Sequence, residues 1–125
     1  MSSFFNLNTE ANYLEITAGG VVGRITGIEL AKELVKYASD HPYGRCLIDY
    51  RAVELITYST IEIYDLPKFH TEMGLPRSLK IGLVVPMRFS KEFYFFETVA
   101  RNSGFWISIF FDYSEAQKWA LAGKY

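Results

Sequence analysis

The chain has 125 residues, of which 50% are hydrophobic and 22% are charged. Its 13 basic and 14 acidic side chains leave a formal net charge of -1, which excludes a dedicated nucleic-acid binder, because such domains carry a strong basic excess. The hydrophobic content excludes a disordered chain and is enough for one core, so we expect a single domain over residues 1–125.

The first third of the sequence predicts two strands and a helix. Residues 12–17 and 21–25 are rich in strand-forming residues, and residues 18–20 (Ala-Gly-Gly) between them are typical of a hairpin turn. Residues 26–29 (Thr-Gly-Ile-Glu) have the form of a capping box, which satisfies the first free amides of a helix. The helix that follows places its apolar residues on one face: Leu30, Ala31, Leu34, Val35 and Ala38.

The middle of the chain predicts a buried strand and a second helix. Residues 41–44 (His-Pro-Tyr-Gly) end the first helix, and residues 45–50 form a short apolar run typical of a central strand. Residues 59–62 (Ser-Thr-Ile-Glu) form a second capping box. Pro67 lies inside the helical pattern and predicts a kink or a restart of that helix.

The last third predicts two more strands and two more helices. Residues 79–85 and 105–111 are core strands, and residues 89–102 form a helix between them. Residues 112–115 (Asp-Tyr-Ser-Glu) are a third capping box, which opens the final helix.

The resulting order, β-β-α-β-α-β-α-β-α, predicts an α/β fold with a mixed, mostly parallel sheet and flanking helices. Ligands of such sheets bind at the carboxyl ends of the strands. We therefore expect the functional residues along that edge, which carries Thr26, Asp49, Arg51, Ser59, Arg88, Ser90 and Asp112.

Three segments resemble the SpoIIAA-like family of STAS domains, which includes an uncharacterised bacterial branch. They are residues 46–53 with the helix start at Ser59, residues 80–85, and residues 109–119, which contain the Asp-x-x-Glu-Ala-x-x-Trp ending of that branch. The resemblance implies a non-enzymatic module that binds a partner protein.

In that family, phosphorylation of one Ser at the start of the second helix switches partner binding. Ser59 stands at the matching place, although the family's Asp-Ser-Ser-Gly reads Thr-Tyr-Ser-Thr over residues 57–60. Tyr58 and Thr60 would line the partner surface. The alternative is that Ser59 is an ordinary helix N-cap and that its two neighbours pack locally.

The charged residues of the predicted edge also allow two interpretations. Asp49 and Arg51 form either a charged pair at a ligand edge or an ion pair that fixes a loop. The guanidinium group of Arg51 or Arg88 would donate two parallel hydrogen bonds to an anion. The free backbone amides at the helix start near Ser90 would also attract the anion.

Four consecutive aromatic residues occupy positions 93–96. Tyr94 and Phe95 point away from the predicted core face at 100° per residue, so they either cover neighbouring elements or form an exposed interface. The related CRAL-TRIO folds carry lipids, so the aromatic surplus also allows a small apolar or lipid-like ligand.

Neither His41 nor His70 has a partner at ligand spacing, and no Gly-x-Ser-x-Gly elbow or phosphate loop occurs, so we predict no metal, no cofactor and no catalytic residues. A single cysteine, no secretory leader pattern and no apolar run of membrane-spanning length predict a cytoplasmic protein.

Three hypotheses about function follow. The first is a regulatory module that binds a protein partner or a second copy of itself as a homodimer. The second is a small carrier of an apolar ligand. The third is an enzyme that uses Asp49, Arg51 and Ser59. We rank it last because these residues supply no complete set of nucleophile, base and orienting group.

Overall fold

The computed structural model describes residues 3–8 and 12–123, and the side chains of Ser3, Phe4 and Phe5 lie outside the description. The described part forms one sheet of five strands: β1 (Ser3–Asn8), β2 (Leu14–Val22), β3 (Arg45–Ile56), β4 (Lys80–Val84) and β5 (Trp106–Phe110). The strands lie in sequence order, with β1 antiparallel to β2 and the other pairs parallel.

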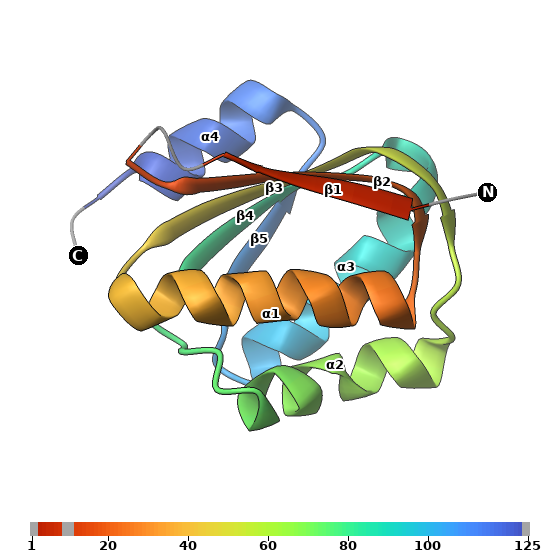
Figure 1. Ribbon diagram of the computed structural model, residues 1–125. Coiled ribbons are helices and arrows are strands. Elements are labelled where there is room, and N and C mark those ends of the chain that lie inside the picture. Colours follow the sequence, from red (N-terminus) through yellow and green to blue (C-terminus); the bar gives the residue numbers. More distant parts are fainter. Residues whose placement is uncertain (1–2, 9–11, 124–125) are drawn as a thin grey trace.

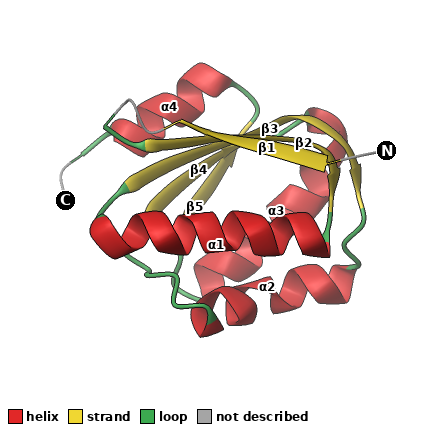
Figure 2. Cartoon of the chain, viewed as in Figure 1, coloured by secondary structure: helices red, strands yellow, loops and turns green. Residues whose placement is uncertain are grey.

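The helices form a layer on each side of this sheet. Their bounds are α1 (Arg24–Asp40), α2 (Thr60–Glu72), α3 (Ser90–Asn102) and α4 (Tyr113–Leu121), with a short 3₁₀ turn, η1 (Met87–Phe89), before α3. Figure 1 shows α1, α2 and α3 on one face of the sheet and α4 on the other. The alternation of strands and helices in Figure 2 confirms the predicted α/β class and element order.

The alternating side chains of β3 separate two hydrophobic cores. Cys46 and Ile48 belong to the larger core, under α1, α2 and α3. Leu47 belongs to the smaller core, under α4. Successive side chains of a strand point to opposite faces of the sheet. Asp49 and Arg51 therefore lie on the same face as Leu47, the α4 side, and Tyr50 lies on the same face as Ile48. This division decides which predicted site residues meet.

The predicted hairpin turn at residues 18–20 is wrong. These residues continue β2, and the antiparallel partner is β1, which pairs Phe4 with Gly19 and Asn8 with Glu15. The glycines instead interrupt the pairing of β2 with β3, where the register shifts twice and Gly20 has a φ of 72°. Glycine tolerates this left-handed conformation, so the pair produces bulges within a strand rather than a turn.

Three other boundaries differ from the prediction. Helix α1 begins at Arg24 with Gly23 at its N-cap, so the strand predicted over residues 21–25 ends at Val22 and the predicted capping box lies inside the helix. The Thr26 hydroxyl donates to the Val21 carbonyl at 3.1 Å and caps nothing. Strand β3 continues to Ile56, because β2 pairs with it beyond Asp49, where its pairing with β4 ends. Helix α2 runs through Pro67 as one helix and does not restart there.

Strand β5 forms one edge of the sheet, and α3 covers its outward backbone groups. The Glu97 carboxylate accepts from the Ile109 amide at 2.7 Å, and the Arg101 guanidinium donates to the Ile107 carbonyl at 2.8 Å. These side chains replace the hydrogen bonds that a further strand would make.

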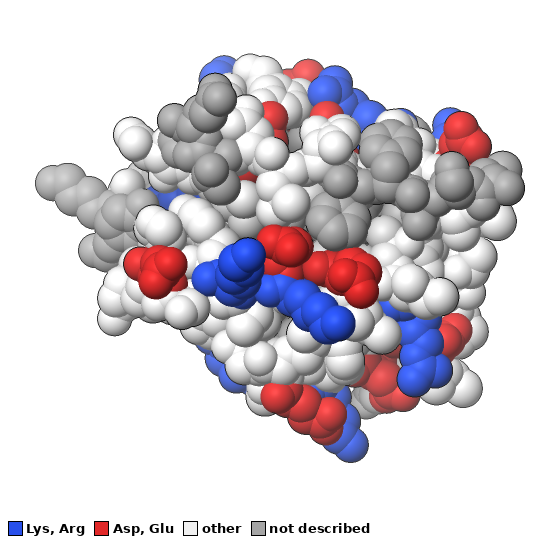
Figure 3. Space-filling view, viewed as in Figure 1, with Lys and Arg blue, Asp and Glu red and all other residues white. Residues whose placement is uncertain are grey.

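The face of the molecule shown in Figure 3 carries basic and acidic side chains next to one another, without a large area of one sign. One such pair, Lys32 and Glu29 on α1, lies 3.9 Å apart. Among the described residues, no helix combines the length and the apolar character needed to span a bilayer.

Candidate functional site

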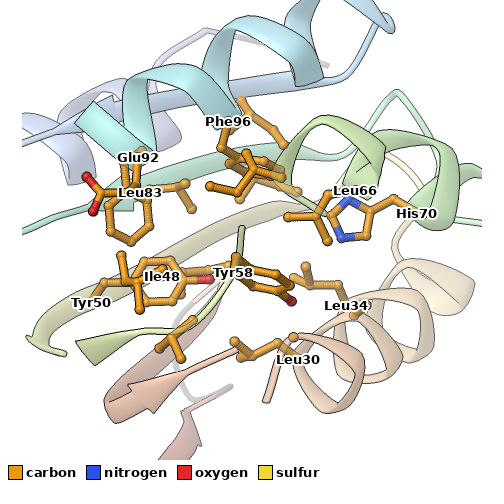
Figure 4. Close-up of a pocket in the computed structure, with 18 of the residues that line it drawn as sticks. Leu30, Leu34, Ile48, Tyr50, Tyr58, Leu66, His70, Leu83, Glu92 and Phe96 are labelled. Atoms are coloured by element: carbon orange, nitrogen blue, oxygen red, sulfur yellow. The ribbon is translucent and has the colours of Figure 1, made fainter. Parts of the chain in front are cut away.

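A cavity of about 90 Å³ lies between the sheet and the layer of α1, α2 and α3. Its walls are mainly aliphatic and aromatic side chains, shown in Figure 4, among them Leu30, Leu34, Ile48, Leu66, Leu83 and Phe96. Four polar side chains also line it: Tyr50, Tyr58, His70 and Glu92. An apolar pocket with a few convergent polar groups is the usual form of a small-molecule site.

Tyr58 reaches the cavity because α1 has a glycine where the tyrosine ring crosses it. A Cβ atom on Gly27 would lie 1.9 Å from the Tyr58 hydroxyl oxygen, so no other residue leaves room for the ring in this position. Burial, followed by the negative charge of Glu62, raises the pKa of Tyr58 to about 12. The phenol therefore stays protonated and is available as a hydrogen-bond donor at neutral pH.

His70 lies on α2 among aromatic rings. Its ring centroid is 6.1 Å from that of Phe96 and 6.3 Å from that of Phe105, in edge-on arrangements. Nδ1 is buried and has no hydrogen-bond partner among the described residues. Burial lowers the pKa of His70 to about 4, so the imidazole is neutral at physiological pH.

A second, more polar hollow of about 250 Å³ lies between α1 and α2. Arg24, Glu62 and Asp65 line it, and it shares two lining residues, Tyr58 and Leu66, with the cavity. These two side chains thus form the wall between an apolar inner compartment and a charged outer groove.

Ser59 forms a complete capping box at the start of α2. Its hydroxyl accepts from the Glu62 amide at 3.2 Å, and the Glu62 carboxylate accepts from the Ser59 amide at 2.8 Å. These hydrogen bonds lower the pKa of Glu62, which keeps its carboxylate ionised beside the serine. Ser59 and Thr60 are both exposed, so the serine is accessible to an enzyme as well as serving as a cap.

Replacement of Ser59 by alanine is expected to lower the free energy of unfolding by about 1 kcal/mol, because the Glu62 amide loses its acceptor. Urea denaturation followed by circular dichroism measures this change. Thr60→Ala is the matched control, one position further into the helix, and should change stability by less than about 0.5 kcal/mol. Equal effects of the two substitutions would show that the capping box contributes nothing.

Asp49 and Arg51 form an ion pair on the α4 side of the sheet. The Arg51 Nη2 atom lies 2.7 Å from Oδ2 of Asp49, and Nε lies 2.9 Å from Oδ1. The guanidinium also lies over the Tyr113 ring of α4, 5.2 Å from its centroid. Both residues therefore lie on the opposite side of the sheet from the cavity and from α2. The structure does not bring them to Ser59, as the enzyme hypothesis required.

The other predicted residues are dispersed along the carboxyl edge. Arg88 is exposed and donates to the Val53 carbonyl, and Ser90 is the first residue of α3. Tyr94 is half exposed, with its ring edge-on to Phe111 at 5.8 Å, and Phe95 is partly buried. Arg88 and Ser90 thus frame the start of α3 without forming a shared pocket with Arg51.

Sequence reasoning missed the cavity residues His70, Leu66 and Glu92. His70 was weighed there only as a metal ligand and as a member of a catalytic triad. The useful signal was helical spacing, because Ile63, Leu66 and His70 follow one another at intervals of three and four residues and share one face of α2. A histidine on such a face points into the interior, where its polar atoms need partners.

Comparison with known proteins adds information on the fold. No protein-family model and no curated protein matches the sequence. A solved structure from Shewanella loihica PV-4, described as an uncharacterized protein from the DUF3478 family with a SpoIIAA-like fold, is similar to this chain with a TM-score of 0.59. The two chains are 15% identical, and the match covers 94% of this chain and 93% of the other. The SpoIIAA-like fold expected from the sequence is thereby confirmed.

Proposed function

We propose that this protein is a non-enzymatic module that binds a small apolar ligand in the cavity between the sheet and α1, α2 and α3. The observation that carries the proposal is the cavity itself, about 90 Å³ in volume and surrounded mainly by carbon atoms. At roughly 24 cal/mol per Å³, an empty cavity of this size costs about 2 kcal/mol of stability. A ligand that fills it recovers contacts that the protein side chains leave unmade.

The size of the cavity limits the ligand. An apolar cavity of roughly 150 Å³ holds one benzene ring, so this cavity holds a short branched chain as it stands. A complete lipid chain does not fit inside it. The ligand class of the second hypothesis is therefore restricted to compact apolar molecules, or to longer molecules that place only their apolar end in the cavity. The rest of a longer molecule would continue past Tyr58 and Leu66 into the outer groove.

The protein-interaction hypothesis is the second candidate, and one observation favours it. Two aliphatic side chains, Ile25 in the first turn of α1 and Ile61 in the first turn of α2, are 79% and 73% exposed. Both helices begin at the carboxyl edge, where Ser59 also lies. Exposed apolar side chains beside an accessible serine suit a partner or a second copy of this chain, with phosphorylation of Ser59 as the regulator.

Native mass spectrometry of the protein purified from its own host distinguishes these functions. We expect a monomer carrying a low-mass adduct that is released when the protein is denatured. The bare polypeptide mass, with no adduct under gentle conditions, would contradict ligand binding. A dimer without adduct, or a phosphate that maps to Ser59, would favour the interaction module instead.

A further inference from the structure

One phenol hydroxyl lies on the wall of this mainly apolar cavity. Tyr50 of β3 lines the cavity, on the same face of the sheet as Ile48. Its ring packs against that of Phe93 on α3, with the two ring centroids 5.1 Å apart. Figure 4 shows the Tyr50 hydroxyl group pointing toward Tyr58, which lines the same cavity. The polar end of the Tyr50 side chain therefore lies among the lining residues.

The Tyr50 hydroxyl oxygen is unpaired and accessible. It makes no hydrogen bond with another residue of the described part of the chain. Among the described residues that are not exposed, the polar side-chain atom that is both unpaired and fully buried is Nδ1 of His70. The Tyr50 oxygen is not sealed in this way, so a ligand atom in the cavity can reach it.

The chemistry of a phenol decides which ligand group suits this position. Burial, followed by the charge of Tyr58, raises the pKa of Tyr50, so its hydroxyl keeps a hydrogen to donate at neutral pH. A carbonyl oxygen accepts that hydrogen bond and brings no hydrogen of its own. An alcohol in the same place would add a donor, which the surrounding carbon atoms would leave without an acceptor.

We propose that Tyr50 is a specificity-determining residue, which selects compact aliphatic ligands that carry one uncharged carbonyl group and donates a hydrogen bond to the carbonyl oxygen. The inference rests on the proposed function, since it assumes that the cavity is the ligand site. A ligand without an acceptor covers the hydroxyl and leaves it unpaired, and a site built for a hydrogen bond rejects such an analogue.

Charged ligands are disfavoured by the same cavity. The described residues that line it include no lysine or arginine, and the lowered pKa of His70 leaves its imidazole uncharged at neutral pH. An anion would therefore find no cation in the wall, which also contains Glu92. A cation would have to leave water for a wall made mainly of carbon atoms, which is costly without a paired charge beside it.

A pair of probe molecules tests the inference. Butan-2-one and 2-methylbutane share one branched skeleton, in which the ketone has a carbonyl oxygen where the alkane has a methyl group. Each probe is titrated into isotope-labelled protein, and binding is followed by the methyl NMR signals of Leu30, Leu34 and Ile48, which line the cavity. The measured quantity is the ratio of the two affinities. The cost of removing the ketone from water is the same for every variant, so it cancels when the ratios of two variants are compared.

We expect Tyr50→Phe to lower the ketone-to-alkane affinity ratio about tenfold, equivalent to about 1.4 kcal/mol, without weakening the binding of the alkane. The substitution removes one unpaired oxygen atom and keeps the ring that packs against Phe93, so the variant should fold. Tyr64→Phe is the matched control. Tyr64 is 65% exposed on α2 and lines neither the cavity nor the outer groove, so this variant should keep the wild-type ratio.

The possible results separate the two proposals. If neither probe binds the wild-type protein, the proposed function fails and the inference fails with it. If 2-methylbutane binds and Tyr50→Phe keeps the wild-type ratio, or lowers it no more than Tyr64→Phe does, the cavity is a binding site but Tyr50 does not select the ligand.

Discussion

Ala31→Leu is expected to abolish binding of 2-methylbutane while leaving the protein as stable as the wild type or more stable, by up to about 2 kcal/mol. Ala31 is buried on α1 and lines the cavity, so the larger side chain enters the space that the ligand would occupy. Filling the cavity removes the cost of leaving it empty, roughly 24 cal/mol per Å³. NMR titration measures the binding, and urea denaturation measures the free energy of unfolding.

Ala38→Leu is the matched control on the same helix. Ala38 is buried in the larger core but does not line the cavity, so leucine there overpacks a filled region and should destabilise the protein by about 1–3 kcal/mol. Helix propensity changes equally in the two variants. If Ala31→Leu destabilises as much as Ala38→Leu, or still binds the alkane, the space beside Ala31 does not act as a ligand cavity.

The free energy of unfolding is expected to fall by about 2–3 kcal/mol more in the wild type than in His70→Phe as the pH is lowered from 7 towards 4. The pKa of His70 is about 4 in the folded protein and roughly 6.5 in the unfolded chain. At a pH between these two pKa values, His70 is protonated in the unfolded state and neutral in the folded state. The free energy of unfolding therefore increases with pH across this window. The contribution is complete above about pH 6.5 and is lost as the pH falls towards 4.

Urea denaturation at several pH values measures this dependence. Carboxylates also titrate in the window, so the test is the difference between the wild type and His70→Phe. His41 is exposed, and His41→Asn should therefore keep the wild-type slope. If the slopes of the wild type and His70→Phe coincide, the imidazole of His70 is hydrated rather than buried in an apolar wall.

Elements with a strong local pattern were predictable from the sequence. The apolar runs over residues 79–85 and 105–111 each contain a strand of the sheet, and the run over residues 45–50 forms the first half of β3. Short runs of this kind are typical of strands that are covered on both faces. Strand β1 was not predictable in this way. It is held by backbone pairing with β2 at the edge of the sheet, and the glycines of β2 gave a stronger local signal for a turn.

The site was less predictable than the fold, since it depends on contacts between distant segments. Tyr58 was singled out as a neighbour of Ser59, and it faces the cavity because Gly27, on another helix, makes room for it. The capping box of Ser59 was predictable because it involves residues only three apart, whereas the same spacing at residues 26–29 lies inside α1 and forms no cap. A cavity arises where three helices and a sheet fail to fill the space between them, and no local pattern contains that information.

The covering of β5 by Glu97 and Arg101 has a consequence for how this chain associates with other chains. An uncovered edge strand is a template on which another polypeptide forms β-structure, which leads to domain swapping or to fibrils. Here a competing strand would first have to displace two charge-assisted hydrogen bonds from α3. Pairing of another chain with β5 would therefore require α3 to give up these contacts first.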